Sequence, residues 1–97
     1  MITIQNIQSI VSKVTGYSIE QIKSPSRKEE IVEARHLSMY FSRFETRTKL
    51  LDITKQHGRD NHATVIHATA VITKAIRTNK RIKSVFETIQ KEIENFS

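Results

Sequence analysis

Apolar residues recur along this chain at spacings of three and four residues, which are typical of amphipathic helices, rather than with the alternation of strands. The first apolar stripe predicts a helix over about Ile4–Val14. Thr3 can cap its start by accepting from a free amide, and Gly16 can end it in the left-handed conformation. The whole pattern predicts an all-α protein of about six helices.

Two residue pairs with capping-box spacing predict the next two helices. Ser18 and Gln21 predict a short helix that ends before Pro25, because the residue ahead of proline disfavours helical backbone. Ser26 and Glu29 predict the start of a long helix. The apolar positions expected to bury this long helix are Ile31, Val32, Leu37, Tyr40, Phe41 and Phe44.

Three further helices complete the predicted fold. Thr48 is expected to begin a helix that ends near Gly58. A longer helix then extends to about Ile76, and the polar run 77–80 is expected to connect it to a last helix over about Ile82–Phe96. The apolar positions are Leu50, Leu51 and Ile53 in the first, Val65, Ile66, Ala68, Val71, Ile72, Ala75 and Ile76 in the second, and Ile82, Val85, Phe86, Ile89, Ile93 and Phe96 in the third.

Composition narrows the class of protein. With 97 residues, 37% of them hydrophobic and 27% charged, the chain is expected to form a single globular domain over residues 1–97 with one modest core. No stretch approaches the roughly 20 apolar residues of a membrane-spanning helix, and no signal-peptide pattern opens the chain. The lack of cysteine excludes disulfide and thiol chemistry and fits a cytoplasmic protein.

The net charge of +6 is distributed unevenly. Residues 35–83 hold eleven Lys or Arg and three acidic residues, whereas the rest of the chain holds five and seven. We expect the positive charge to surround the segment 58–68, where it would attract a polyanion such as DNA. The alternative is that these basic residues only solubilise an exposed face, and charge alone does not separate the two interpretations.

The segment 58–68, GRDNHATVIHA, gives the sharpest functional indication. Gly58 can take the positive φ that ends one helix, and Asp60 or Asn61 can cap the next by accepting from its free amides. A helix, a tight turn and a second helix form the arrangement of helix-turn-helix domains, in which the first residues of the second helix contact base edges in the major groove. The segment therefore predicts a protein that recognises duplex DNA.

This segment also resembles the signature of the C-terminal DNA-binding domain of the bacterial replication initiator DnaA, which is usually close to GGRDHTTVLHA. The shared element H-[AT]-T-V-x-H-A is His62–Ala68 here. ITIQNIQSIV at 2–11 and EARHLSMYFSR at 33–43 resemble the opening and the middle helix of that domain, so the resemblance covers about the whole chain. It implies a compact helical domain, similar also to the Trp repressor, that binds DnaA boxes at a replication origin.

The first residues of the motif helix are the candidates for DNA recognition. Asn61 and His62 can offer polar side chains to base edges, and Ala63 offers a methyl group suited to a thymine methyl. Thr64 has a hydroxyl placed to meet a phosphate, which the amides at a helix N-terminus also attract. The alternatives are a simple N-cap for Asn61 and an exposed His62 without a role. His67, between apolar neighbours, is expected to be packed and bonded to backbone.

The resemblance implies a second contact, from an arginine in the loop before the long helix to the minor groove. Arg27 is the matching residue, and narrow A·T-rich minor grooves concentrate the negative potential that attracts such a side chain. Arg35 and Arg43 match basic positions of the family's long helix and are expected to contact phosphates. Arg47 and Lys49 are added as phosphate contacts on the basis of their charge alone. The alternative for each of these basic residues is a side chain that is only exposed to solvent.

This chain departs from the family's pattern in two places. Glu29 and Glu30 follow Arg27 where the family is richly basic, so repulsion from phosphate is expected to weaken the minor-groove contact. Asn61 and Ala63 stand where the family commonly has Asp and Thr. Because asparagine can donate as well as accept, and favours adenine, the preferred DNA sequence is expected to differ from that of the family.

The sequence lacks the residue patterns that nucleotide binding, zinc binding and catalysis require. With only Gly16 and Gly58, no Walker A phosphate loop can be written, so neither ATP binding nor another cofactor is expected. His57, His62 and His67 are five residues apart, a spacing that does not suit a helical zinc pair. No nucleophile or carboxylate pair clusters for catalysis. We therefore expect no metal and no enzymatic activity.

Double-stranded DNA is the expected partner, bound by a monomer that does not unwind it and does not attach to a membrane. The full-length initiator and other replication proteins are further candidates. Two alternatives stay open: an interaction or regulatory module that has kept the fold but docks on a protein, and a transcription regulator resembling the Trp repressor. Met1 directly before Ile2 favours a short native protein over an excised domain, without deciding between them.

Overall fold

The computed structural model describes residues 1–96, which form six helices and contain no strand. The helices are α1 (Ile4–Thr15), α2 (Ile19–Lys23), α3 (Glu29–Glu45), α4 (Leu50–Gln56), α5 (Ala63–Thr78) and α6 (Lys80–Glu94). The prediction of an all-α fold of six helices is confirmed. None of these helices is long and apolar enough to cross a membrane.

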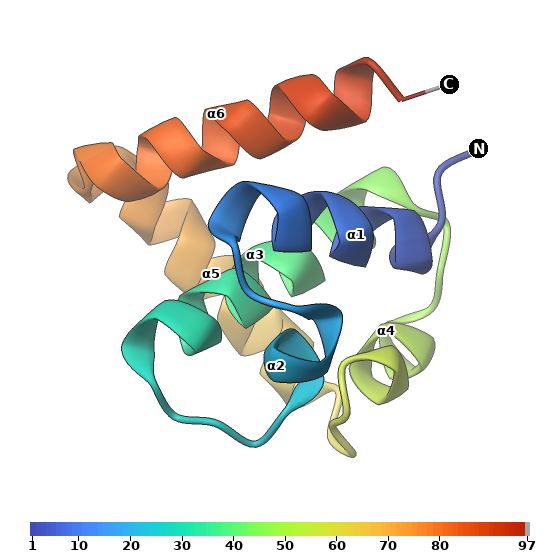
Figure 1. The fold of residues 1–97 in the computed structure, drawn as a ribbon. Coiled ribbons are helices and arrows are strands. Elements are labelled where there is room, and N and C mark those ends of the chain that lie inside the picture. Colours follow the sequence, from blue (N-terminus) through green and yellow to red (C-terminus); the bar gives the residue numbers. More distant parts are fainter. Residues whose placement is uncertain (97) are drawn as a thin grey trace.

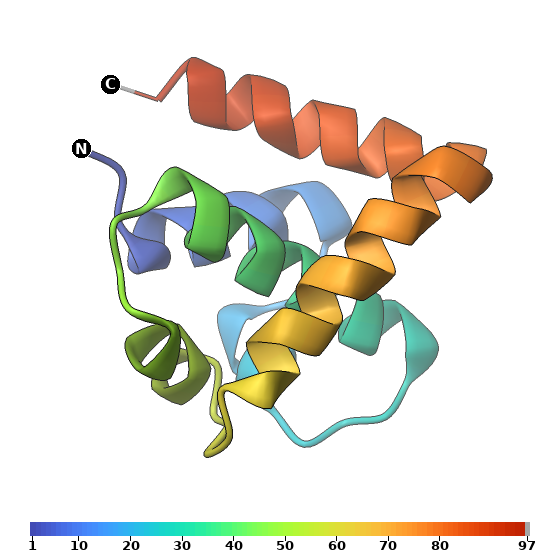
Figure 2. The same cartoon turned by 180° about the vertical axis from the view of Figure 1, so that it is seen from behind.

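The central helix is α3, and α1, α2, α4 and α5 all pack against it (Figure 1). α6 lies across α1 and the end of α5, on the side away from α2 and α4 (Figure 2). The short helices α2 and α4 and the start of α5 consequently share one end of the molecule.

The predicted start and stop signals of the first two helices are confirmed. The hydroxyl of Thr3 accepts from the amide of Asn6 at 3.1 Å, and Gly16 ends α1 with a φ of 84°. Ser18 and Gln21 form the predicted capping box at the start of α2. These signals are reliable because both partners lie within one turn of each other in the sequence.

Two other predicted helix starts are wrong. α3 begins after Lys28 without a side-chain cap, and the hydroxyl of Ser26 accepts instead from the amide of Lys28 at 3.2 Å. α4 begins after Lys49, and the hydroxyl of Thr48 accepts from that of Thr46 at 2.9 Å. In both places the hydroxyl bonds within the preceding loop, a local alternative that competes with capping.

The predicted connection at 77–80 is also wrong. α5 continues through Thr78 and α6 starts at Lys80, so that Asn79 alone joins them. The side chain of Asn79 accepts from two amides of the first turn of α6, at 3.0 and 3.1 Å, and thereby caps that helix. Phe96, expected on the buried face of the last helix, lies beyond its end and is exposed.

Two apolar clusters form the core. The larger one joins α1, α3 and α6, with Ile22 of α2 and Ile72 of α5 beside them, and its rings Phe41 and Phe86 lie 4.7 Å apart. The smaller one lies between α3, α4, α5 and the start of α1, and consists of Ile4, Met39, Ile53, Val65 and Ala68. Phe44, Leu51 and Ile66 were expected in the core but are exposed, because their apolar stripes are wider than the faces that their helices bury.

Candidate nucleic-acid interface

α4, the turn 57–62 and α5 form the predicted helix-turn-helix. Gly58 occupies the turn with a φ of 72°, the positive value expected for it. Ile53 of α4 and Val65 of α5 are fully buried in the smaller cluster, where they fix how the two helices cross. In Figure 2 the start of α5 lies beside α4, and α5 runs away from it toward α6.

A buried histidine fixes the end of α4. His57 is fully buried, with Nδ1 2.8 Å from the carbonyl oxygen of Ile53 and Nε2 2.6 Å from the hydroxyl of Ser38. Because a carbonyl only accepts, Nδ1 carries the proton, and Nε2 accepts from Ser38. Burial lowers the pKa of His57 to about 4, so the ring is neutral near pH 7. The sequence indicated no such role for this residue.

The candidate base-contacting residues gather at the start of α5. Asn61, His62 and Ala63 are exposed, and Thr64 is half-buried. Oδ1 of Asn61 accepts from the amide of Ala63, the first residue of α5, at 2.9 Å, but the N-cap position itself is His62, whose side chain makes no capping bond. Because Oδ1 is engaged in this bond, the Nδ2 donors of Asn61 are the atoms most available to a ligand.

Arg27 is exposed in the loop between α2 and α3. This loop contacts the turn before α5, since Nη2 of Arg59 donates to the carbonyl oxygen of Ser24 at 2.9 Å. Figures 1 and 2 both show the loop and the turn at the same end of the molecule. The structure therefore brings the predicted minor-groove residue to the same end as the predicted major-groove residues.

Arg35 does not have the free side chain expected of a phosphate contact. It is 5% exposed, and its Nε donates to the carbonyl oxygen of Ile22 at 2.8 Å. Its Nη2 donates to the carbonyl oxygens of Ser24 and Ser26 at 2.7 and 3.0 Å. Burial, and secondarily the charge of Arg59, lower the pKa of Arg35. The structure contradicts the predicted phosphate contact because the side chain is buried and its Nε and Nη2 donors already bind backbone carbonyls.

The remaining candidate phosphate contacts lie on α3 and in the connection between α3 and α4. Arg43 is half-buried beside α5, where its Nη1 donates to the hydroxyl of Thr69 at 3.3 Å and its guanidinium lies 5.4 Å from the centre of the Phe44 ring. Arg47 and Lys49 are exposed in the connection between α3 and α4. These three contacts to DNA stay predictions.

The basic residues of segment 35–83 divide between two ends of the molecule. One group surrounds the helix-turn-helix and consists of Arg43, Arg47, Lys49, Lys55 and Arg59. The other lies at the junction of α5 and α6 and consists of Lys74, Arg77, Lys80, Arg81 and Lys83. The 16 residues of α5 span about 24 Å between its start, beside the first group, and its end, at the second. The expectation that the charge gathers around the motif therefore holds only for the first group.

His67 is exposed rather than packed against backbone, which corrects the prediction for it. Its ring lies edge-on to that of His36 on α3, with centroids 5.7 Å apart. His36 is half-buried, and its pKa is lowered to about 4, mainly by burial and next by His67. Among residues 1–96 no group of three His, Asp or Glu side chains could hold a metal ion.

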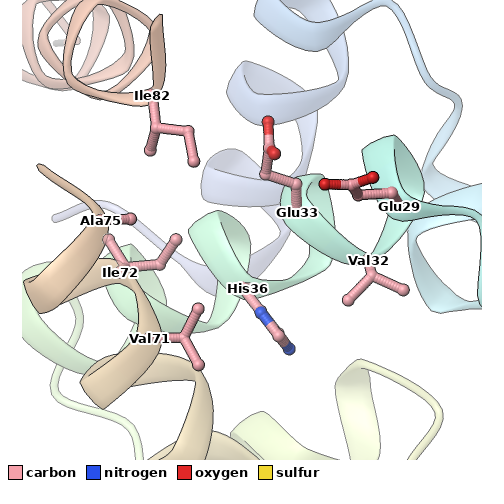
Figure 3. A pocket seen from close by; sticks show the side chains of 8 residues that line it. All are labelled: Glu29, Val32, Glu33, His36, Val71, Ile72, Ala75 and Ile82. Atoms are coloured by element: carbon pink, nitrogen blue, oxygen red, sulfur yellow. The ribbon is translucent and has the colours of Figure 1, made fainter. Parts of the chain in front are cut away.

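A groove of about 250 Å³ lies between α3, α5 and the start of α6 (Figure 3). It is lined by Glu29, Val32, Glu33, His36, Val71, Ile72, Ala75 and Ile82. The carboxylate of Glu33 is bound by Arg81 through two hydrogen bonds of 2.8 Å. Because the walls are aliphatic and the remaining charges are acidic, this groove does not suit a phosphate and is not part of the candidate interface.

Comparison with known proteins agrees with this arrangement. Residues 4–72 match the family described as bacterial dnaA protein helix-turn-helix. The chromosomal replication initiator protein DnaA of Porphyromonas gingivalis is 39% identical over 94 residues, which are 97% of this chain and 20% of that protein.

Two further relatives have the same name. The chromosomal replication initiator protein DnaA of Flavobacterium psychrophilum is 34% identical over 92 residues, covering 95% of this chain and 19% of the relative. The DnaA protein of Streptococcus mutans is 37% identical over 93 residues, which are 96% of this chain and 21% of that relative. The chain thus spans about a fifth of the length of the relatives that it matches.

Proposed function

Because this chain belongs to the bacterial DnaA helix-turn-helix family, we propose that it is a sequence-specific binder of double-stranded DNA with no ATPase activity of its own. Residues 1–97 act as one DNA-binding domain that binds as a monomer at sites that resemble DnaA boxes. The observation that carries this proposal is the exposure of Asn61, His62 and Ala63 at the start of α5, at the same end of the molecule as Arg27.

In the proposed complex, α5 enters the major groove with its first turn against the base edges. Asn61 presents its Nδ2 donors, because its Oδ1 accepts from Ala63, and so favours a base with an acceptor at that point, such as a purine N7 or a thymine O4. His62 offers a second polar contact, and the methyl group of Ala63 fits a thymine methyl. Arg27 enters the adjacent minor groove.

Phosphate contacts position the protein on the duplex in this proposal. Thr64 lies in the first turn of α5, where the helix N-terminus also favours an anion. Arg43 on α3, and Arg47 and Lys49 in the connection to α4, add further positive charge. If about four to six phosphates are neutralised, log K falls against log salt with a slope of about −4 to −5. A slope near zero would reject DNA as the main ligand.

The test starts from duplexes that the wild-type protein selects out of a random pool. Fluorescence anisotropy then compares the selected duplex with a scrambled one for each variant. His62→Ala and Asn61→Ala are expected to cost about 1 to 3 kcal/mol on the selected duplex and almost nothing on the scrambled one, because base contacts act only on the preferred sequence.

Arg43→Ala is expected to behave differently. It should weaken binding to every duplex similarly and reduce the steepness of the salt slope by about one, as the loss of a phosphate contact does. Arg77→Ala, at the far end of α5, is the matched control and should change little. Equal losses on all duplexes for His62→Ala would show that α5 does not read bases. Failure to select any sequence would favour a module that docks on a protein instead.

A further inference from the structure

The loop between α2 and α3 is held to α3 by its carbonyl oxygens. Besides the carbonyl oxygen of Ile22 in α2, the buried guanidinium of Arg35 binds two of them, at Ser24 and Ser26. Arg27 directly follows the last of these positions and is exposed. Because hydrogen bonds from Arg35 fix the backbone next to Arg27, the position from which its side chain extends is restricted before any ligand arrives.

Arg59 binds the same loop from the turn before α5. Its Nη2 donates to the carbonyl oxygen of Ser24 at 2.9 Å, the oxygen that also accepts from Arg35. Its Nη1 donates to the carbonyl oxygen of Gly58 at 3.1 Å and lies 3.4 Å from that of Lys23. One planar guanidinium therefore spans the turn and the end of α2, which a fork of donors can do and an ammonium cannot.

Gly58 gives independent support for this junction. A Cβ atom at Gly58 would lie 2.5 Å from the carbonyl oxygen of Lys23, which is far inside van der Waals contact. Because that neighbour is backbone at the end of α2, it cannot rotate away as a side chain could. The turn and the loop are consequently fitted together with no space for a side chain between them.

We propose that Arg59 is a positioning residue that joins the α2–α3 loop to the turn, so that Arg27 and the start of α5 meet DNA as one rigid unit. This inference rests on the proposed function, since it assigns a purpose to contacts within the free protein. Arg59 lies two residues before Asn61, and the carbonyl that it shares with Arg35 lies three residues before Arg27. A loop fixed in advance loses less conformational entropy when it enters the groove.

Arg59→Lys separates this role from a direct phosphate contact. Lysine keeps the charge but lacks the fork, so a phosphate contact would largely survive the change and the junction would not. Arg59→Gln removes both the charge and the planar set of donors. It serves as a second variant, so that the conclusion does not depend on the lysine substitution alone. Arg77→Lys, on the exposed far end of α5, is the matched control.

The first measurement is the A·T preference, defined as the affinity ratio between the selected duplex and one with G·C pairs at its minor-groove positions. Arg27→Ala is expected to lower this ratio about fivefold or more, the effect of losing one sequence-dependent contact. Arg59→Lys and Arg59→Gln should lower it similarly. Combining Arg27→Ala with Arg59→Lys should lower it no further, because both changes remove the same contact. A variant that is only less stable would bind both duplexes more weakly by the same factor, which leaves the ratio unchanged.

The second measurement uses the free protein, so it does not depend on DNA. Backbone ¹⁵N order parameters at Arg27 and Lys28 are expected near 0.85 in the wild type and below about 0.6 in both Arg59 variants, with the other helices unchanged. A loop that stays rigid in these variants would overturn the inference, and so would an A·T preference that survives them.

One further outcome concerns the proposed function itself. If Arg27→Ala leaves the A·T preference intact, the minor-groove contact is absent. Arg59 then has no minor-groove contact to position, even if the order parameters show that the loop loosens in the Arg59 variants. The inference is then rejected together with that part of the proposed function. This pattern differs from an A·T preference that Arg27→Ala removes and Arg59→Lys retains, which would reject the inference alone.

Discussion

The two sides of α3 are stabilised by different kinds of contact. Toward α1 and α6, the packing is apolar, with the rings of Phe41 and Phe86 at its centre. Toward the helix-turn-helix and the α2–α3 loop, the smaller apolar cluster is supplemented by hydrogen bonds from Arg35, Arg59 and His57, whose acceptors are mostly backbone carbonyls. Apolar packing is non-directional, whereas each hydrogen bond requires a distance and an angle.

This difference corresponds to a division of tasks. The apolar side supplies stability and involves none of the candidate DNA-contacting residues. The polar side bears Arg27, Asn61 and His62 on loop and helix-start backbone, where helical packing alone would not set their positions. We infer that damage to the apolar side should unfold the protein, whereas loss of the Arg59 contacts on the polar side should alter how it binds DNA.

The largest effect is expected from the apolar side. Phe41→Ala or Phe86→Ala should lower the free energy of unfolding by about 3 to 5 kcal/mol, because each loses its burial and leaves a cavity. The total free energy of unfolding of a small protein is only about 5 to 15 kcal/mol. A loss of this size should therefore weaken binding to every duplex. Urea unfolding followed by circular dichroism measures the change.

Phe44→Ala is the matched control for these variants. Its ring is 54% exposed, so the change should cost about 1 kcal/mol or less. A Phe41→Ala variant as stable as Phe44→Ala would contradict the assignment of the core.

The next largest effect concerns the polar side and is the dependence of the protein's stability on pH. The pKa of His57 is about 4 in the folded protein and about 6.5 when unfolded, so between these values the unfolded chain binds more protons. Stability is therefore complete above about pH 6.5 and is lost as the pH falls toward 4. The loss attributable to His57 should reach about 2 to 3 kcal/mol by pH 4.5.

Urea unfolding at pH 7 and at pH 4.5 measures this loss. His36 has a similarly lowered pKa and acts in the same direction, so His57→Gln should remove part of the pH dependence rather than all of it. An identical pH dependence in the wild type and in His57→Gln would show that the buried ring is not what makes this side sensitive to acid.

The smallest effect concerns the charge next to Arg27. Glu29 and Glu30 are exposed at the start of α3, and each is expected to repel a nearby phosphate. Two unit charges about 4 Å apart in water interact by about 1 kcal/mol, so Glu29→Gln or Glu30→Gln should tighten DNA binding by at most about fivefold. Anisotropy at low salt measures it, with Glu87→Gln on α6 as the control. Unchanged affinity would place these carboxylates away from the duplex.

Much of the fold could be predicted because its signals are local. The caps of α1 and α2 join residues three apart, and the apolar stripes identify Phe41, Phe86 and Ile53 as core. The motif 58–68 led to the helix-turn-helix and to the family. Each of these depends on side chains whose types and spacing are visible in the sequence.

The sequence by itself determined six helices, a turn centred on Gly58 and a polar helix start at Asn61 and His62. Only the tertiary structure decided that Arg35 is buried beneath the α2–α3 loop, that Arg59 ties this loop to the turn, and that His57 is fully buried. The acceptors in these contacts are mostly backbone carbonyls. Because every residue carries a carbonyl, no pattern of residue types marks which one an arginine or a histidine will meet.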